Sequence, residues 1–159
     1  MAEKKAGPGS VVADNRKARY DYAIEESFEA GLALTGSEIK SVRNGRLNLR
    51  GGYARLQNGE VVLYDVHISP YEQSGVYFNH EPTRARKLLL NRREISRIAG
   101  LVDRQGYTLV PLRVYFKGRL AKLELGLAKG KKHYDKREDI ATREAKRDID
   151  RAMKTRRFE

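Results

Sequence analysis

The sequence contains no cysteine and no tryptophan, and it has no long run of apolar residues. Without cysteine there is no disulfide, no zinc–thiolate site and no thiol nucleophile. The chain lacks the apolar core of a signal peptide and any apolar run of about 18 residues, so we expect a cytoplasmic protein that does not span a membrane. Its 159 residues predict one domain plus an extension. A core of about 110–130 residues can fold without a metal or disulfide.

No arrangement of residues typical of an enzyme is present. The three histidines, His67, His80 and His133, lie in separate segments without the spacing of metal ligands. No G-x-S-x-G nucleophile motif occurs. Residues 128–132 contain a Gly–Lys pair but lack the upstream glycine and the following Ser or Thr of a Walker phosphate loop. We therefore expect no enzymatic activity, no metal and no cofactor.

Positive charge is plentiful. The chain has 33 Lys and Arg residues against 21 Asp and Glu, which gives a net charge of +12. This excess indicates a polyanionic partner. A membrane surface would need a basic helix with a broad apolar face rich in Trp, Phe or Leu, and the most basic helical segment has only a thin apolar stripe. Nucleic acid is therefore the expected partner, and no membrane is expected.

Composition divides the chain into three regions. Residues 1–13 lack hydrophobic periodicity and predict a flexible basic arm. Residues 14–128 predict a folded domain, and residues 129–159 predict a hinge and a charged tail. From residue 131 onward, 29 positions hold 11 Lys or Arg and 7 Asp or Glu. The few apolar residues there cannot anchor a helix, so we expect the tail to be disordered when free and helical when bound.

Alternating apolar residues between turn residues predict several antiparallel strands in the folded region. A first strand is expected at 20–24. Asn58-Gly59 separates apolar runs at 53–56 and 61–66, and this dipeptide favours the type I′ turn of a tight hairpin.

A second hairpin is expected from strands at 107–116 and 120–127. Its alternation predicts which side of each strand is buried. Lys122 and Glu124 are expected to face solvent or a ligand. The residues expected to share one face are Val110, Leu112, Val114 and Phe116 on the first strand and Ala121, Leu123, Leu125 and Leu127 on the second.

Capping residues predict short helices. Thr35-Gly36-Ser37-Glu38 is a capping box, so we expect a helix over about 36–43 that stops near Asn44-Gly45. Asn91 can cap a second helix, which ends before Gly106. Hairpin strands with two or three short helices favour a mainly β fold, a small, partly open antiparallel barrel of the oligonucleotide-binding type. An open α+β sandwich is the alternative.

Residues 82–93 place five cations around a run of three leucines. The cations have no matching acids nearby in the sequence, which favours contact with phosphate. The alternative is a solvated loop with Leu88 and Leu90 in the core. The cations assigned to a nucleic-acid face are Arg16, Lys17 and Arg19 before the first strand, Arg84, Arg86 and Lys87 here, and Lys129, Lys131 and Lys132 in the hinge.

Four separated motifs stand out along the chain: Asn15-Arg16-Lys17-Ala18-Arg19, the run from Glu29 to Ser41, the run from Arg86 to Asn91, and the run from Ala128 to Arg137. In this order they resemble the SsrA-binding protein family, also called small protein B. The resemblance runs from about residue 9 to the C-terminus. It implies a bacterial protein whose oligonucleotide-binding-type barrel binds the tRNA-like domain of tmRNA near the elbow and D-loop, as a monomer with one copy per tmRNA.

The resemblance also implies site residues. In that family, protein and RNA together mimic a tRNA, and the tail enters the empty mRNA channel and decoding centre of a stalled ribosome. Tyr20 stands where many members have His, so a stacking role could persist there but a protonation-dependent one could not. The family's RNA-contacting positions fall on Asn15, Glu29, Leu89 and Lys122. The expected ribosome-binding residues of the tail are Tyr134, the signature Asp135, Lys136 and Arg137, and Ile149 and Met153.

Two other functions remain as alternatives. A general single-strand RNA-binding barrel would gather several aromatic residues on one sheet face, whereas the nine tyrosines and four phenylalanines here are spread through the chain. A ribosome-associated structural protein held by its basic tail would occur in constant ratio to ribosomes rather than to one RNA.

Overall fold

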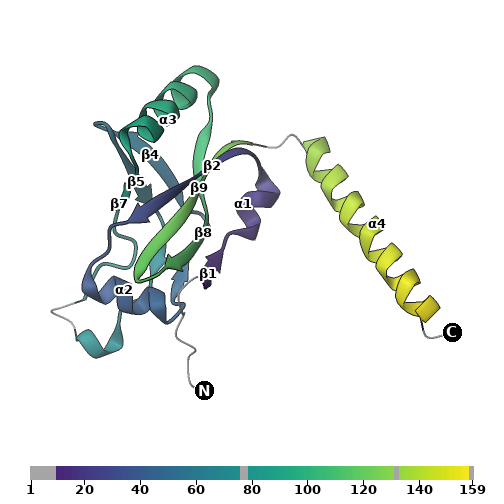
Figure 1. Cartoon of the computed structure of the whole chain (residues 1–159), viewed down its shortest axis with the longest axis horizontal. Helices are drawn as coiled ribbons and strands as arrows, with labels where there is room; N and C mark the ends of the chain where they lie inside the picture. Colours follow the sequence, from purple (N-terminus) through teal and green to yellow (C-terminus); the bar gives the residue numbers. More distant parts are fainter. Residues whose placement is uncertain (1–9, 76–78, 131–132, 158–159) are drawn as a thin grey trace. The chain divides into compact units, whose positions relative to one another are not determined.

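The computed structural model describes residues 10–75, 79–130 and 133–157, and the chain divides into two compact units (Figure 1). The first unit ends at Lys129 and contains the sheets. The second begins at Gly130 and contains one long helix, α4 (His133–Arg157). None of the helices in the described ranges is long and apolar enough to cross a membrane.

The first unit is an antiparallel β-barrel. Its strands follow the order β8-β4-β5-β7-β2-β9, and β9 pairs with β8 to complete the ring. A single residue pair, Ala54 and Leu109, joins β4 to β8, so few hydrogen bonds close the ring on this side. The predicted mainly β barrel is confirmed. The ring strands are β2 (Tyr22–Leu32), β4 (Tyr53–Gln57), β5 (Glu60–Tyr64), β7 (Arg86–Leu89), β8 (Thr108–Lys117) and β9 (Leu120–Gly130).

Both predicted hairpins are confirmed. Asn58 and Gly59 have φ values of 50° and 76°, the positive values that a type I′ turn between β4 and β5 requires. In β9, Lys122 and Glu124 lie outside the core as expected. Each aliphatic side chain buried in the barrel stabilises it by roughly 1.5–3 kcal/mol. The residues of β9 that face the core are Ala121, Leu123, Leu125 and Leu127.

The prediction that four residues of β8 share one face was wrong. Pro111 pairs with Leu125 and Arg113 pairs with Glu124, so Leu112 is the extra residue of a β-bulge. The bulge reverses the alternation. Val114 and Phe116 lie in the barrel core, whereas Val110 and Leu112 lie in a second apolar cluster with Ala18 and Ala128.

That second cluster lies beneath a short helix, α1 (Arg16–Asp21), where the sequence predicted a basic lead-in and the start of a strand. Ala18 is the buried residue of α1, and Tyr20 lies within the helix. Part of the segment expected as a flexible arm, residues 1–13, is ordered. Val11–Asp14 form strand β1, which pairs with β8, and residues 1–9 lie outside the described ranges.

The two capped helices match their predicted positions. The capping box of Thr35 and Glu38 is formed at α2 (Gly36–Arg43), and the Asn91 side chain caps α3 (Arg92–Gln105). Gly106 ends α3 with a left-handed φ of 66°. The remaining elements are the short strands β3 (Leu47–Asn48) and β6 (His67–Ile68), which pair with each other, and the 3-10 turn η1 (Glu72–Ser74).

In the second unit, residues of the charged tail form α4. The side chains described there, at 137 and 140–154, are all exposed. The large apolar ones, Ile140, Ile149 and Met153, are 41%, 57% and 62% exposed. Disorder of the free tail stays a prediction.

Candidate nucleic-acid interface

Three residues of the expected RNA-binding set lie on the outer side of neighbouring strands. Leu89 is on β7, Glu29 on β2 and Lys122 on β9, and these strands are adjacent in the order β7-β2-β9. Their chain neighbours, such as Leu88 and Leu123, point into the core. We call Leu89, Glu29 and Lys122 the candidate face.

The Glu29 carboxylate is held by residues of β8. The Tyr115 hydroxyl donates to Oε2, and the Lys117 ammonium lies 3.3 Å from Oε1. The hydrogen bond from Tyr115, aided by the charges of Lys117 and Lys122, lowers the pKa of Glu29. Burial and the Glu29 carboxylate raise the pKa of Tyr115 to about 12. At neutral pH the carboxylate is therefore ionised and the phenol is a donor.

Leu89 supplies an apolar contact on this otherwise polar surface. Its side chain is 53% exposed. It lies opposite Gly31 of β2, where an added Cβ would come within 3.1 Å of the Leu89 Cβ. Because Gly31 has no side chain, Leu89 can pack closely against β2 at this position. Gly31 is two residues along the strand from Glu29. An exposed leucine beside a carboxylate and an ammonium can contact a base or a ribose.

Asn15, the fourth residue of the expected set, has a structural role. It is 6% exposed, and its Oδ1 accepts a hydrogen bond from the Ala18 amide at 3.1 Å, which caps α1. Its Nδ2 donates to the carbonyl oxygens of Pro111 and Leu49, at 2.9 and 3.3 Å. The polar atoms of Asn15 thus fix α1 to the barrel, and its direct contact with RNA stays a prediction.

Through that cap, Asn15 positions three cations of α1. Arg16 and Lys17 are exposed. Arg19 is 41% exposed, and its guanidinium is 2.7 Å from the Asp14 carboxylate and 3.8 Å from that of Glu124. The helix therefore carries positive charge on its exposed side, next to β8 and β9.

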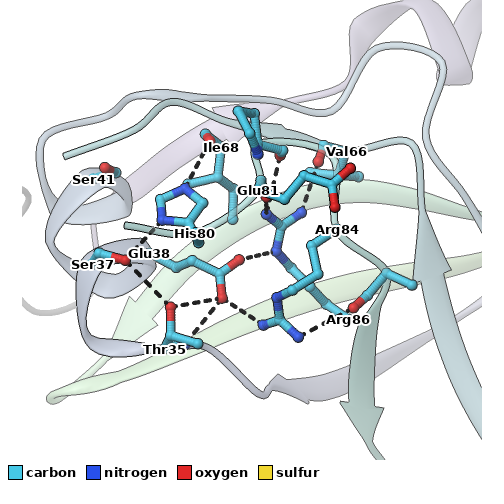
Figure 2. Close-up of polar contacts among 12 residues, drawn as sticks. Thr35, Ser37, Glu38, Ser41, Val66, Ile68, His80, Glu81, Arg84 and Arg86 are labelled. Atoms are coloured by element: carbon cyan, nitrogen blue, oxygen red, sulfur yellow. Dashed lines mark hydrogen bonds and ion pairs between the residues drawn. The ribbon is translucent and has the colours of Figure 1, made fainter. Parts of the chain in front are cut away.

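Three of the five cations of residues 82–93 have acidic partners that come from distant parts of the chain. Figure 2 shows the guanidinium groups of Arg84 and Arg86 converging on the Glu38 carboxylate. Arg84 Nη2 lies 2.5 Å from Oε1, and Arg86 Nε donates to Oε2. Lys87 pairs with Glu60 across the strands at 2.9 Å. These acids could not be assigned from the sequence, because they belong to α2 and β5, which are far from residues 82–93 along the chain.

Arg86 is buried, so its guanidinium group is not part of the protein surface. Its side chain is 1% exposed and Glu38 is 0% exposed. Arg86 also donates to the carbonyl oxygens of Val66 and Pro82, at 2.8 and 3.1 Å. Burial alone would raise the pKa of Glu38, but hydrogen bonds from Thr35, Arg84 and Arg86 outweigh it and lower the pKa to about 2.

The pair of Glu38 and Arg86 therefore ties α2 to β7, the strand that ends at Leu89. Arg84 and Lys87, 39% and 49% exposed, can still face a ligand.

The hinge and tail residues are described in part. Lys129 is exposed, and its ammonium lies 4.5 Å from the centroid of the Tyr107 ring. Lys131 and Lys132 lie outside the described residues. Among the tail residues expected at the ribosome, Arg137, Ile149 and Met153 are exposed on α4, whereas the side chains of Tyr134, Asp135 and Lys136 are outside the described set.

Sequence reasoning missed Tyr115 and Lys117, which flank Glu29. The position of Tyr115 could have been predicted from the hairpin turn, because pairing Lys117 with Leu120 across the turn places Tyr115 opposite Lys122. The hairpin therefore predicts a neighbour for Lys122. The contact with Glu29 could not be predicted in this way, since it needs the position of β2. Across the described part of the chain, no group of three or more His, Cys, Asp or Glu side chains could hold a metal ion.

Comparison with known proteins identifies the relatives of this chain. A family model described as SmpB protein matches residues 12–155. An SsrA-binding protein of Roseiflexus sp. (strain RS-1) is 76% identical over 146 residues, covering 92% of each protein. One of Chloroflexus aurantiacus is 68% identical over 158 residues, covering 99% of this chain and 98% of the relative. A chain of the solved structure "tmRNA-SmpB: a journey to the center of the bacterial ribosome" matches with a TM-score of 0.64 and 50% identity, over 77% of this chain and 85% of that one.

Proposed function

Because the chain belongs to the SmpB family of SsrA-binding proteins, we propose that it binds the tRNA-like domain of tmRNA and delivers that RNA to stalled ribosomes for trans-translation. The protein acts in the cytoplasm, where ribosomes work, as a monomer with one copy per tmRNA. It acts by binding and not as an enzyme. The observation that carries the proposal is the candidate face, which gathers Glu29, Leu89 and Lys122 on three adjacent strands.

The candidate face offers three kinds of contact to RNA. Glu29 accepts hydrogen bonds from base amino groups or 2′-hydroxyls, Leu89 packs on a base or ribose, and Lys122 pairs with phosphate. Arg16, Lys17, Arg19, Arg84, Lys87, Lys129, Lys131 and Lys132 add the longer-range positive charge. A general single-strand binder is disfavoured, because its bases would need an aromatic platform where this face has a leucine and two charged side chains.

The two units take different parts in this function. Residues 14–128 bind tmRNA, with help from the lysines at 129, 131 and 132, and the rest of the tail acts at the ribosome. The tail enters the empty mRNA channel and the decoding centre of the small subunit, where Tyr134, Asp135, Lys136, Arg137, Ile149 and Met153 contact ribosomal RNA. Interleaved acids and bases at helical spacing suit a segment that folds when confined by a partner.

Gel-shift titration of the full chain against tmRNA and against an unrelated structured RNA tests the binding. We expect clear preference for tmRNA at physiological salt and an affinity that falls as salt rises, since phosphate contacts release counterions. Equal affinity for both RNAs would exclude specific recognition and favour the general RNA-binding alternative.

Glu29→Ala and Lys122→Ala are each expected to weaken tmRNA binding by about tenfold, the effect of losing one hydrogen bond to a charged group. Glu26→Ala is the matched control for the first, because Glu26 lies on the other side of β2 and pairs with Arg97 at 2.8 Å. Lys40→Ala, on α2, is the control for the second. Circular dichroism should show the same fold in all four variants. Unchanged dissociation constants for both candidate-face variants would refute this RNA face.

A further inference from the structure

Tyr115 lies on β8 and neighbours two residues of the candidate face, Lys122 and Glu29. It is opposite Lys122 in the pairing of β8 with β9. Its hydroxyl crosses to β2 and donates to Glu29 Oε2, a contact between residues 86 positions apart. Tyr115 therefore connects β8 to Glu29 on β2, and it is also the cross-strand neighbour of Lys122 on β9.

The Tyr115 ring has a second contact that limits its movement. The Arg113 guanidinium carbon is 5.4 Å from the ring centroid, a distance typical of a cation–π contact. Arg113 is fixed in turn, because its Nε lies 2.5 Å from Glu124 Oε2 on β9. The phenol is thus held by its ring and by its hydroxyl, and it can act as a rigid support for the carboxylate.

The support leaves part of the carboxylate free. An ionised carboxylate can accept about four hydrogen bonds. Tyr115 donates to Oε2 and Lys117 approaches Oε1, and the Glu29 side chain remains 41% exposed. Acceptor positions therefore remain open to solvent, with their direction set by β8.

We propose that Tyr115 is a positioning residue for RNA recognition: it fixes the Glu29 carboxylate so that the open acceptor positions receive an N–H or O–H donor of the bound RNA. This inference rests on the proposed function. The physical gain is preorganisation, because a glutamate already held in one rotamer loses less conformational freedom on binding. Lys117 assists as a second, longer contact, and Tyr115 itself does not need to touch the RNA.

A double-mutant cycle with the tRNA-like domain of tmRNA separates positioning from direct contact. Tyr115→Phe removes only the hydroxyl and should weaken binding about three- to tenfold, the usual effect of one hydrogen bond. In the Glu29→Ala background the same change should have no further effect, because the group it positions is gone. Tyr64→Phe is the matched control. The Tyr64 hydroxyl is also a surface donor, to Gln57 at 2.5 Å, and its loss should leave affinity unchanged.

Two results of the cycle would overturn the inference. Tyr115→Phe with wild-type affinity would show that the support does not matter. An equal loss in the presence and absence of Glu29 would show that the hydroxyl contacts RNA directly or acts through the fold. If instead the wild-type chain does not prefer tmRNA over other RNA, the proposed function fails first, and the inference fails with it.

RNA variants identify the donor. A transcript with 2′-deoxy substitutions removes hydroxyl donors, and one with inosine for guanosine removes the guanine amino group. The variant that lacks the donor should bind wild-type and Glu29→Ala proteins alike. Purine riboside for adenosine and pyrimidin-2-one riboside for cytidine remove the other base amino groups. If none of these substitutions reduces the difference between the two proteins, Glu29 receives neither a 2′-hydroxyl nor a base amino group, and the assigned recognition is wrong.

An NMR titration of the Glu29 carboxyl carbon tests the support in the protein without RNA. The hydrogen bond from Tyr115 is the largest cause of the lowered pKa of Glu29, so Tyr115→Phe should move that pKa upward. Tyr64→Phe should not move it. An unchanged pKa in Tyr115→Phe would show that the hydroxyl does not hold the carboxylate in solution, and it would overturn the inference even if RNA binding is normal.

Discussion

The barrel and the tail helix α4 use similar residues in opposite ways. In the barrel, leucines and valines alternate along the strands and are buried, and charged residues such as Glu38 and Arg86 pair across 48 positions of sequence. In α4, the described aliphatic side chains are exposed, and Asp148 pairs with Arg151 only three positions away at 4.0 Å. The shape of the barrel is thus set by contacts between distant segments, whereas α4 depends on local interactions that are weak in water.

This contrast predicts that mutations in one unit impair the function or stability of that unit without impairing the other. Changes to the tail should alter activity on the ribosome without altering the barrel. Changes to the buried polar groups of the barrel should alter stability first, and RNA binding as a consequence. The variants below test that separation, from the largest expected effect to the smallest.

Deleting residues 131–159 should reduce peptidyl transfer to alanyl-tmRNA on stalled ribosomes to the background rate. The segment holds few apolar residues, so the free energy of unfolding of the barrel should change by less than about 0.5 kcal/mol. Binding to tmRNA should weaken only modestly, through loss of Lys131 and Lys132. Transfer is measured at saturating tmRNA complex, full-length against truncated protein. Transfer at the full-length rate by the truncated protein would show that the tail is dispensable.

Glu38→Gln should lower the free energy of unfolding by roughly 3–5 kcal/mol, because it leaves the Arg86 guanidinium buried without its counterion. The pKa of Glu38 is about 2 in the folded chain and 4.5 is its ordinary value. The lowered pKa therefore contributes stability above about pH 4.5, and this contribution is lost as the pH falls toward 2. Urea unfolding across that range should show a flatter pH dependence in the variant.

Glu60→Gln is the control for the loss of stability expected in Glu38→Gln. Glu60 pairs with Lys87 at 2.9 Å, but both side chains are about half exposed, at 51% and 49%. Its loss should therefore cost less than about 1 kcal/mol. Equal losses in Glu38→Gln and Glu60→Gln would contradict the importance of burial.

Asn15→Ala should lower the free energy of unfolding by about 2–3 kcal/mol, since it removes the cap of α1 and leaves two carbonyl oxygens without their donor. The exposed cap of α3 provides the comparison, and Asn91→Ala should cost about 1 kcal/mol. Asn15→Ala should also weaken tmRNA binding, because α1 carries Arg16 and Lys17. Reduced RNA affinity with unchanged chemical stability would instead indicate that Asn15 contacts RNA directly.

Asp148→Ala should have the smallest effect. Its ion pair with Arg151 is exposed and local, so the change should reduce the helicity of α4 by an amount equivalent to about 0.5 kcal/mol or less. Far-UV circular dichroism of the full chain measures the helicity, and urea unfolding followed by tyrosine fluorescence measures the barrel. A lowered unfolding midpoint of the barrel would show that the two units are coupled.

The interactions that sequence analysis predicted correctly are local ones. The type I′ turn at Asn58-Gly59, the capping box at Thr35 and the left-handed end of α3 at Gly106 each depend on a few consecutive residues. Helix α1 was missed because its six residues are mostly charged. The carbonyl oxygens that hold the Asn15 side chain in its capping position and the packing of Ala18 on Leu112 both come from outside α1, from the rest of the first unit.

The sequence by itself therefore determined the turns, the helix caps, the mainly β class and, through its motifs, the family. Tertiary structure alone decided that Leu112 forms a bulge, that Arg86 is buried against Glu38, and that Tyr115 holds Glu29. The physical reason is separation along the chain. A turn or cap gains its free energy within four or five residues, whereas a buried ion pair or a cross-strand hydrogen bond exists only once distant strands have been brought together and water has been excluded.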